Sequence, residues 1–351
     1  MQLEALGFDD VFRAAFDSLS DPDLVPGRVC AASHEHYRVL TAAGSCEARL
    51  RGRLRRDADH PVVGDWVALR RPAAGHASIE ALLPRRGALL RKRPGVGEPQ
   101  LIAANLDWVL VISSLNRDFE PRRIERALAQ VWEAGAQPVI VLTKLDLCPD
   151  WTEQREALTH VARGVPVHAL CTRDARAAEQ LAPYLSAGST VALIGSSGVG
   201  KTTLTNRLLG GAELDTGPVR AGDDKGRHTT TRRELFVLPS GALLIDTPGM
   251  RELGLWDASS GLDQAFGDVS ELAERCRFSD CGHQAEPGCA VREALASGAL
   301  DVARYESFDK LKREIAHLVQ KSEPQARNAR RREQRAIHRQ YSRLQRERGR
   351  D

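Results

Sequence analysis

The sequence predicts a multi-domain protein: an all-β, OB-like barrel, then an α/β domain with a phosphate-binding loop, then an α-rich metal-binding domain. Three observations predict this division. Short β-like runs separated by turns fill residues 25–90, apolar strands alternate with helical segments over 101–262, and cysteines cluster with a histidine near residue 280. The expected segments are a helical extension (1–24), the barrel (25–90), a linker (91–100), the α/β domain (101–262), the metal-binding domain (263–320) and a basic tail (321–351).

The composition is that of a soluble globular protein, with 42% hydrophobic and 28% charged residues in a chain of 351. No apolar run approaches the roughly 20 residues that a membrane span needs, and the acidic N-terminus does not resemble a secretory signal. The seven cysteines are odd in number, and several lie close to a histidine. This pattern favours a metal site in a reducing compartment over disulfides, so we expect a cytoplasmic protein without a membrane partner.

The N-terminal part predicts a short amphipathic helix followed by β-strands. Leu3, Leu6, Phe12 and Phe16 recur at loosely helical spacing within the first 20 residues. The barrel strands are expected at GRVCAAS, HYRVLTA, CEARLRGRL, GDWVALR and ASIEALL. The basic, turn-rich stretch that follows, up to residue 100, is typical of a linker.

The central part predicts a mostly parallel sheet covered by helices on both faces. Its strands are expected at LDWVLVISSL, QPVIVLTKLD, VPVHAL and STVALIG, followed by a hairpin over ELFVLPSGALLIDTPG. A helix is expected from Pro121 to just before Gly135, because proline favours the first turn and glycine follows helix ends. Further helices are expected over 150–163 and 174–187.

The segment GSSGVGKT fits the pattern G-x-x-x-x-G-K-[ST] of phosphate-binding loops. It follows an apolar strand and leads into a helix, so its N–H groups would face phosphate oxygens at a helix N-terminus. Lys201 would reach the β- and γ-phosphates, and the Thr202 hydroxyl would hold Mg²⁺. The expected nucleotide contacts here are Gly195, Ser196, Ser197, Gly198, Val199, Gly200, Lys201, Thr202 and Thr203.

Two segments downstream would complete the triphosphate site. Asp246 closes the apolar strand LLID on the Mg²⁺ side, and Gly249 would offer its N–H to the γ-phosphate. The polar loop GDDKGRHTTTRREL lies between the two motifs, as expected of a segment ordered by γ-phosphate and Mg²⁺. Thr230 is our candidate for the metal-contacting hydroxyl, with Thr229 and Thr231 as alternatives. The other interpretation is a plain surface loop without a role in metal binding.

The segment TKLD has the [NT]KxD form with which some proteins recognise guanine. Asp146 would accept the N1 and N2 protons of guanine, which adenine cannot supply. Lys144 would pack beside the base, flanked by Thr143 and Leu145. TKLD precedes the phosphate loop, whereas ordinary GTPases have the reverse order. The segment is therefore either a chance tetrapeptide or part of a circularly permuted nucleotide site.

The segment CRFSDCGHQAEPGC places four potential ligands in the pattern C-x4-C-x-H-x5-C. Three thiolates and one imidazole form a closed tetrahedral set, which is typical of a structural Zn²⁺ ion. The expected ligands are Cys276, Cys281, His283 and Cys289. Unrelated buried thiols are the alternative.

Arginines gather in two places that would suit a polyanion. Arg49, Arg51, Arg53 and Arg55 alternate with small or apolar residues, so a strand would point them to one face of the barrel. Residues 326–351 hold ten arginines against three acids, with Arg330, Arg331 and Arg332 in a row. We expect both regions to contact RNA, against the alternatives of a solvated charged face and a solubilising tail.

The order TKLD, GSSGVGKTT, GRHTTT, DTPG resembles that of the circularly permuted GTPases. With the barrel and the Cys/His cluster, the chain is similar to the RsgA (YjeQ) family over nearly its whole length. The resemblance implies a GTPase that acts in late assembly of the small (30S) ribosomal subunit, contacts 16S rRNA through its barrel and releases after hydrolysis. It also implies slow hydrolysis that the subunit stimulates, and we expect a monomer.

Two departures from this pattern concern the base and the attacking water. The second base-contacting segment would fall at HALCT, which matches the usual Ser-Ala pattern poorly. Met250 stands where many GTPases have a water-orienting glutamine, and the family resemblance implicates His228 instead. Two rival functions remain: an RNA-binding checkpoint that uses guanine nucleotide only as an affinity switch, and an ATP-dependent assembly factor.

Overall fold

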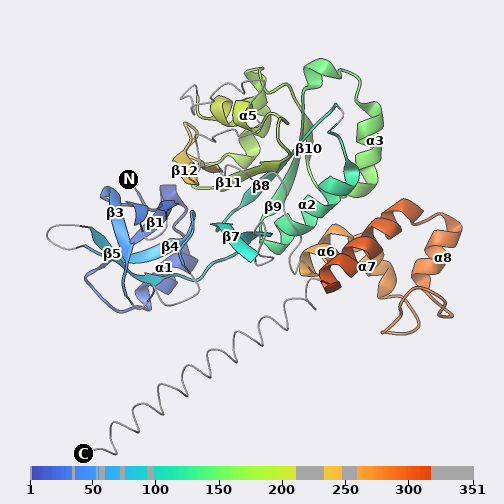
Figure 1. Cartoon of the computed structure of the whole chain (residues 1–351), viewed down its shortest axis with the longest axis horizontal. Coiled ribbons are helices and arrows are strands. Elements are labelled where there is room, and N and C mark those ends of the chain that lie inside the picture. Colours follow the sequence, from blue (N-terminus) through green and yellow to red (C-terminus); the bar gives the residue numbers. More distant parts are fainter. Residues whose placement is uncertain are drawn as a thin grey trace, which may run out of the picture.

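The computed structural model describes residues 2–33, 36–52, 54, 60–71, 76–92, 99–116, 118–210, 233–246 and 259–317. Figure 1 shows a β-barrel and a group of C-terminal helices on different sides of a central α/β domain. Among the described residues, no helix is both long enough and apolar enough to cross a membrane.

The N-terminal extension forms two short helices rather than the single helix expected. The 3₁₀-helix η1 (Glu4–Leu6) ends at Gly7, which has a φ of 80°. Helix α1 (Asp10–Asp17) then begins where the Asp9 carboxylate accepts from the N–H groups of Val11 and Phe12. The glycine and the new N-cap divide the segment, and Phe12 is buried against Trp66 of the barrel, with ring centroids 5.9 Å apart.

The barrel consists of β1 (Leu24–Ser33), β2 (His36–Thr41), β3 (Gly44–Leu50), β4 (Trp66–Arg70) and β5 (Ala77–Leu82). The strands pair in the order β1-β2-β3-β5-β4, and β4 pairs with β1 to close the ring. All these pairs are antiparallel except β3–β5. The expected barrel is therefore present. Its interior is filled by alternating apolar residues such as Val39, Leu69 and Ile79.

Two paired strands occupy both ends of the stretch 91–100, for which a linker was expected, and residues 93–98 between them lie outside the described residues. Strand β6 (Ala88–Lys92) pairs antiparallel with β7 (Pro99–Ala104) in a separate two-stranded sheet. Leu89, Ile102 and Ala103 are buried in the core shared with the α/β domain. The apolar residues of β6 and β7 thus pack these two strands against the rest of the molecule.

The α/β domain is built on the sheet order β10-β9-β8-β11-β13-β12. Its strands are β8 (Trp108–Ser114), β9 (Gln137–Thr143), β10 (Val167–Ala169), β11 (Thr190–Gly195), β12 (Glu234–Val237) and β13 (Leu243–Asp246). All are parallel except β12, which forms the expected hairpin with β13. At its other edge β12 pairs with β1 through Glu234 and Ala31, so the sheet continues into the barrel.

Helices cover both faces of this sheet, as predicted, because its strands are apolar on both sides. The helices are α2 (Pro121–Glu133), α3 (Thr152–Val161), α4 (Arg176–Leu181) and α5 (Lys201–Leu208), with 3₁₀ turns η3 (Leu145–Leu147) and η4 (Ala182–Tyr184). Residues of α2 and α3 share one core with Val109 and Ile140, whereas those of α4 and α5 share another with Leu110 and Val141. Successive strand residues therefore face opposite helix layers.

The C-terminal domain contains α6 (Ser259–Ala265), α7 (Gly267–Ala273), α8 (Ala290–Ser297) and a last helix over residues 302–317. Its core includes Phe266, Val269, Val291 and Phe308, and it also takes in Ala129 of α2. The α-rich fold expected here is present. In Figure 1 helix α6 of this domain lies beside α2, and α8 lies on the far side of the domain.

Candidate functional site: a nucleotide site and a metal-binding cluster

The predicted phosphate loop joins β11, the strand between β8 and β13, to the N-terminus of α5. Gly195 has a φ of 148°, and a Cβ there would lie 2.2 Å from the carbonyl oxygen of Ile112 in β8. Lys201 folds back over the loop, with Nζ donating to the carbonyls of Gly195 and Ser196 at 2.6 and 2.5 Å. Thr202 and Thr203 are exposed in the first turn of α5. The segment therefore has the strand, loop and helix arrangement of a phosphate site.

TKLD lies at the C-terminal end of β9 and touches the phosphate loop directly. The Thr143 hydroxyl is fully buried and donates to the carbonyl of Val199 at 2.5 Å, with a second contact of 3.3 Å to the carbonyl of Ser113. Asp146 is exposed beyond it, on η3. The two segments therefore meet at one edge of one sheet, as the permuted arrangement requires.

Lys144 takes up a left-handed backbone conformation, with a φ of 63°. Such a conformation is unfavourable for a residue with a side chain and is concentrated at functional sites. The N–H of Leu145 donates to the carbonyl of Leu170, which ties the turn to the end of the neighbouring β10 strand. The surroundings thus hold Lys144 and Asp146 in a fixed turn.

The segment HALCT lies beside the phosphate loop despite its poor match to the usual pattern. Thr172 is buried, and its methyl carbon and hydroxyl oxygen lie 3.5 Å from the point where a Cβ on Gly200 would stand. The sequence indicated this position by order along the chain only. Arg123 had no sequence signal at all, yet its Nη1 lies 2.7 Å from the Ser196 hydroxyl.

On the other side of the phosphate loop, Asp246 ends β13 next to β11. The parallel register Ala192↔Ile245 brings Asp246 level with the strand residues that precede the loop, and Asp246 is half-buried. His228, Thr230 and Gly249 lie outside the described residues. The described part therefore brings together the phosphate loop, TKLD and Asp246.

The predicted metal ligands form a compact cluster in the C-terminal domain. The ligand atoms of Cys276, Cys281, His283 and Cys289 all lie within 4.8 Å of one another. The Sγ atoms of Cys276 and Cys289 are 3.9 Å apart, and His283 Nδ1 lies 3.6 and 3.5 Å from them. Tetrahedral Zn²⁺ with bonds of about 2.3 Å to sulfur and about 2.0 Å to nitrogen needs separations of roughly 3.8 and 3.6 Å. The geometry thus suits a four-coordinate metal.

The surroundings of His283 also suit a ligand. Burial, followed by the nearby Lys312 ammonium, lowers the pKa of His283, which favours the neutral imidazole that binds metals. Its φ of 58° is left-handed. Glu286, which the sequence did not single out, shapes this turn by accepting from the N–H groups of Gly282, Gln284 and Ala285 at 2.9 to 3.0 Å. Backbone donors hold the pKa of Glu286 at about 2.

The arginines expected to bind RNA are only partly described. Arg49 is exposed and Leu50 beside it is buried, as the alternation predicted, but β3 ends at Leu50, so the exposed Arg51 lies beyond the strand that was expected to continue to residue 54. Arg51 already pairs with Glu80 on β5. Arg53, Arg55, Arg330, Arg331 and Arg332 lie outside the described residues.

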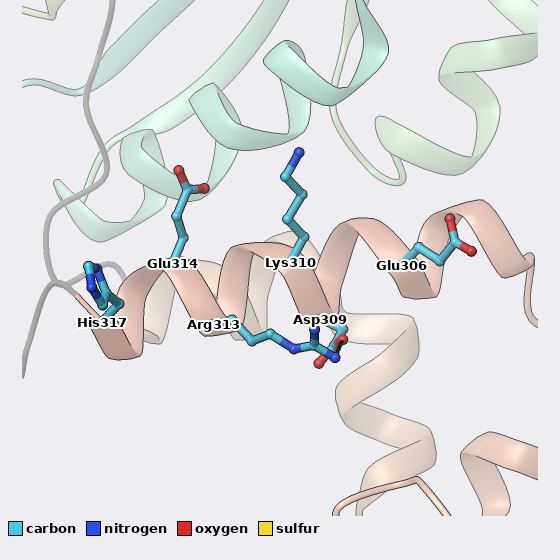
Figure 2. A pocket seen from close by; sticks show the side chains of 6 residues that line it. All are labelled: Glu306, Asp309, Lys310, Arg313, Glu314 and His317. Carbon is cyan, nitrogen blue, oxygen red and sulfur yellow. Dashed lines mark ion pairs between the residues drawn. The ribbon is translucent and has the colours of Figure 1, made fainter.

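An open groove of about 540 Å³ runs along the last helix. Figure 2 shows its lining residues, which are Glu306, Asp309, Lys310, Arg313, Glu314 and His317. Acidic and basic groups are mixed here, and Glu314 pairs with Arg126 of α2 at 2.8 Å. The mixed charge suits neither a triphosphate nor an RNA backbone, and none of the predicted nucleotide contacts lines the groove.

A phosphate loop that touches a T-K-x-D turn, on a parallel sheet whose base-side strands precede the loop, defines a circularly permuted GTPase fold. The family model described as RsgA GTPase matches residues 82–256, and RsgA N-terminal domain matches 26–79. Small ribosomal subunit biogenesis GTPase RsgA of Syntrophotalea carbinolica is 44% identical over 99% of both chains. The chain therefore belongs to the RsgA GTPase family.

Further comparisons agree with this assignment. RsgA of Opitutus terrae is 47% identical over 92% of both chains. The crystal structure of YjeQ from Thermotoga maritima superposes with a TM-score of 0.65 at 27% identity, covering 84% of this chain and 99% of that one. YloQ, described as a circularly permuted GTPase, gives 0.62 at 25% identity, with 84% and 96% covered. A model described as ABC transporter also matches residues 178–346, a range that contains the phosphate loop.

Proposed function

We propose that this chain hydrolyses GTP to GDP and phosphate during late maturation of the 30S ribosomal subunit, and leaves the subunit after hydrolysis. The carrying observation is the hydrogen bond of 2.5 Å from Thr143 to Val199, which fixes the base-side turn against the phosphate loop. The curated relatives are named small ribosomal subunit biogenesis GTPases, and their lengths match this chain closely.

In this proposal the two ends of the nucleotide are held by different segments. Asp146 accepts the two guanine protons and Lys144 packs beside the base, while the N–H groups of residues 195–203 surround the phosphates. Lys201 neutralises the β- and γ-phosphates, since its ammonium already lies over the loop. Desolvation of an unpaired Asp146 carboxylate disfavours adenine.

Mg²⁺ would be held by Thr202 and Thr230, with Asp246 acting through a bound water. The position of Asp246 beside β11 supports this role. When bound, Mg²⁺ supplies positive charge to the β- and γ-phosphates. We propose His228 as the residue that positions the attacking water.

The metal of the cysteine and histidine cluster is proposed to be a structural Zn²⁺ ion. Three thiolates and one imidazole leave no position for a reacting water. We assign the barrel to the OB type from its five-stranded order. Two groups of arginines are proposed to contact 16S rRNA, namely Arg49, Arg51, Arg53 and Arg55 in the N-terminal part and Arg330, Arg331 and Arg332 in the tail. We propose a monomer that acts in the cytoplasm.

The test is turnover of GTP, XTP and ATP by the wild-type chain and Asp146→Asn, with and without purified 30S subunits at stated salt. We expect GTP hydrolysis that 30S subunits accelerate, and a shift of the variant toward xanthine nucleotides, because asparagine no longer accepts both guanine protons. Turnover that 30S subunits leave unchanged would favour the checkpoint function, in which the nucleotide only switches RNA affinity. Equal use of ATP would favour the ATP-dependent factor.

A further inference from the structure

Helix α2 lies between the sheet and the C-terminal domain. Ile124, Leu128 and Val131 belong to the core shared with the sheet, whereas Ala129 belongs to the core of the C-terminal domain. Residues Glu125, Ala129 and Glu133 recur every four positions, so they line one face of the helix. Any movement of the C-terminal domain therefore acts on α2 through this face.

The central contact on that face is a buried ion-pair network. Arg304, on the last helix, is 5% exposed, and its Nη1 donates to Glu125 at 2.9 Å. The same guanidinium donates to Asp268 at 3.0 Å and to the carbonyl of Ala265 at 2.7 Å. Ser307 donates to the second oxygen of Glu125. Because these groups are desolvated, separating them is costly, and α2 should move together with the C-terminal domain.

The C-terminal end of α2 is also in close contact with the C-terminal domain. The N–H of Gly261 in α6 donates to Glu133 at 2.9 Å. A Cβ on Gly261 would lie 2.0 Å from the carbonyl oxygen of Ala129, so only glycine allows this approach. Two helices this close cannot slide without breaking the contact.

The N-terminal end of α2 reaches the phosphate loop. Nη1 of Arg123 donates to the Ser196 hydroxyl and to Asp118, both at 2.7 Å. The carbonyl of Ser196 also accepts from Lys201 at 2.5 Å, so Ser196 lies between Arg123 and the phosphate-binding lysine. Arg123 is two positions from Glu125, or about 3 Å along the helix axis.

We propose that Arg123 is a positioning residue that sets the phosphate loop according to how the C-terminal domain is held. When the 30S subunit holds the C-terminal domain in place, that domain fixes α2 through Arg304. Helix α2 then fixes Arg123 against Ser196, and with it the backbone that aligns Lys201. The inference rests on the proposed function, because it assigns the route by which 30S subunits stimulate turnover.

The experiment compares Arg123→Ala, Arg123→Lys and the matched control Arg122→Ala in kcat and KM for GTP, with and without 30S subunits. Arg122 is the neighbouring cation on the same helix, and its ion pair with Glu306 is 4.0 Å long with both side chains more than half exposed, so it should couple the last helix to α2 only weakly. We expect Arg123→Ala to lower the stimulation ratio about tenfold, Arg123→Lys to restore part of it, and Arg122→Ala to keep the wild-type ratio. Circular dichroism and thermal melting of each variant establish that it is folded.

A double-mutant cycle with Ser196→Ala tests the contact itself. If Arg123 acts through Ser196, the losses in stimulation ratio are not additive, because either substitution removes the same hydrogen bond. Additive losses, an unchanged ratio in Arg123→Ala, or an equal fall of basal and stimulated turnover would each overturn the inference. If the wild-type chain itself shows no turnover or no stimulation, the proposed function fails instead.

Discussion

The barrel and the C-terminal domain are fastened to the α/β domain by different chemistry. On the barrel side, the buried Arg28 donates to the backbone carbonyls of Leu6, Gly64 and Asn105, so one guanidinium joins the extension, the barrel and the approach to β8. On the other side, Arg304 is neutralised by the carboxylates of Glu125 and Asp268. One junction is a cation among neutral acceptors, and the other is an ion-pair network.

This difference has a measurable consequence for the arginines. Burial lowers the pKa of Arg28 to about 10, with Asp107 and Asp65 acting in the opposite direction. A cation among carbonyls cannot be replaced by an apolar residue without leaving those carbonyls unpaired, whereas a compensated ion pair can be replaced as a unit. The two junctions should therefore respond differently to paired substitutions.

Removal of the proposed Zn²⁺ ion should have the largest effect on stability, and it should destabilise the C-terminal domain but not the barrel. Chelation is expected to disorder the segment around residues 276–289, because structural zinc contributes roughly 10–16 kcal/mol in small metal-binding folds. Limited proteolysis with mass spectrometry should find new cleavage there and none in the barrel. Cys281→Ser should lose the metal, while Cys46→Ser, a free cysteine of the barrel, should keep it. Equal destabilisation of both domains would contradict the comparison.

Arg304→Ala should lower the free energy of unfolding by about 3–5 kcal/mol, because Glu125 is left buried and unpaired. The double variant Arg304→Met with Glu125→Leu leaves no buried Glu125 charge, although Asp268, whose side chain is 17% exposed, still loses its partner, and it should recover part of this loss. Chemical denaturation measures both. A double variant as unstable as the single one would show that the ion pair cannot be replaced as a unit.

Arg28→Met should cost about 2–3 kcal/mol, since three carbonyls lose their donor. No companion substitution of an acidic residue should rescue it. Asp107→Asn, the obvious candidate by analogy with Glu125, is expected to leave the loss in denaturation midpoint unchanged. Recovery in that double variant would mean that Arg28 depends on an ion pair after all.

Glu234→Gln should have the smallest effect. It removes the ion pair of 2.9 Å with Arg38 where β12 meets the barrel, but these side chains are 29% and 42% exposed. Exposed pairs contribute less than about 1 kcal/mol, and salt screens them. Thermal melting in low and high salt should show a small shift that vanishes in high salt. A large shift that persists in salt would place the barrel junction in the same class as Arg304.

The sequence predicted those features that depend on local chemistry. The phosphate loop, TKLD and the metal cluster each need particular residue types at fixed spacing, so they could be recognised without a structure. The extent of α2 was also predicted, since Pro121 and Gly135 mark its ends. In contrast, Arg28 finds its partners 22 to 77 positions away in the chain, and Arg123 reaches Ser196 across 73 positions. No local pattern distinguishes them from surface arginines.

The strand pair β6–β7 illustrates a second limit of prediction from sequence, which is that the same residues can suit two local structures. Arg91, Lys92 and Pro99 suit a linker as well as they suit strands, and only the pairing of β6 with β7, with Leu89 and Ile102 buried in the core, decides between the two. The same holds for the N-terminal extension, where Gly7 and Asp9 act as helix end and helix start only in the folded context.

The position of β11 in the sheet has a consequence for synthesis. Strands β8, β9 and β10 leave the ribosome before β11, and the edge of β8 stays open until β11 emerges some 75 residues after it. At roughly 5–20 residues per second, this exposes an apolar strand edge for about 4–15 s. Nascent chains that meet during this interval can pair through that edge, so we expect rapid overproduction to favour insoluble protein.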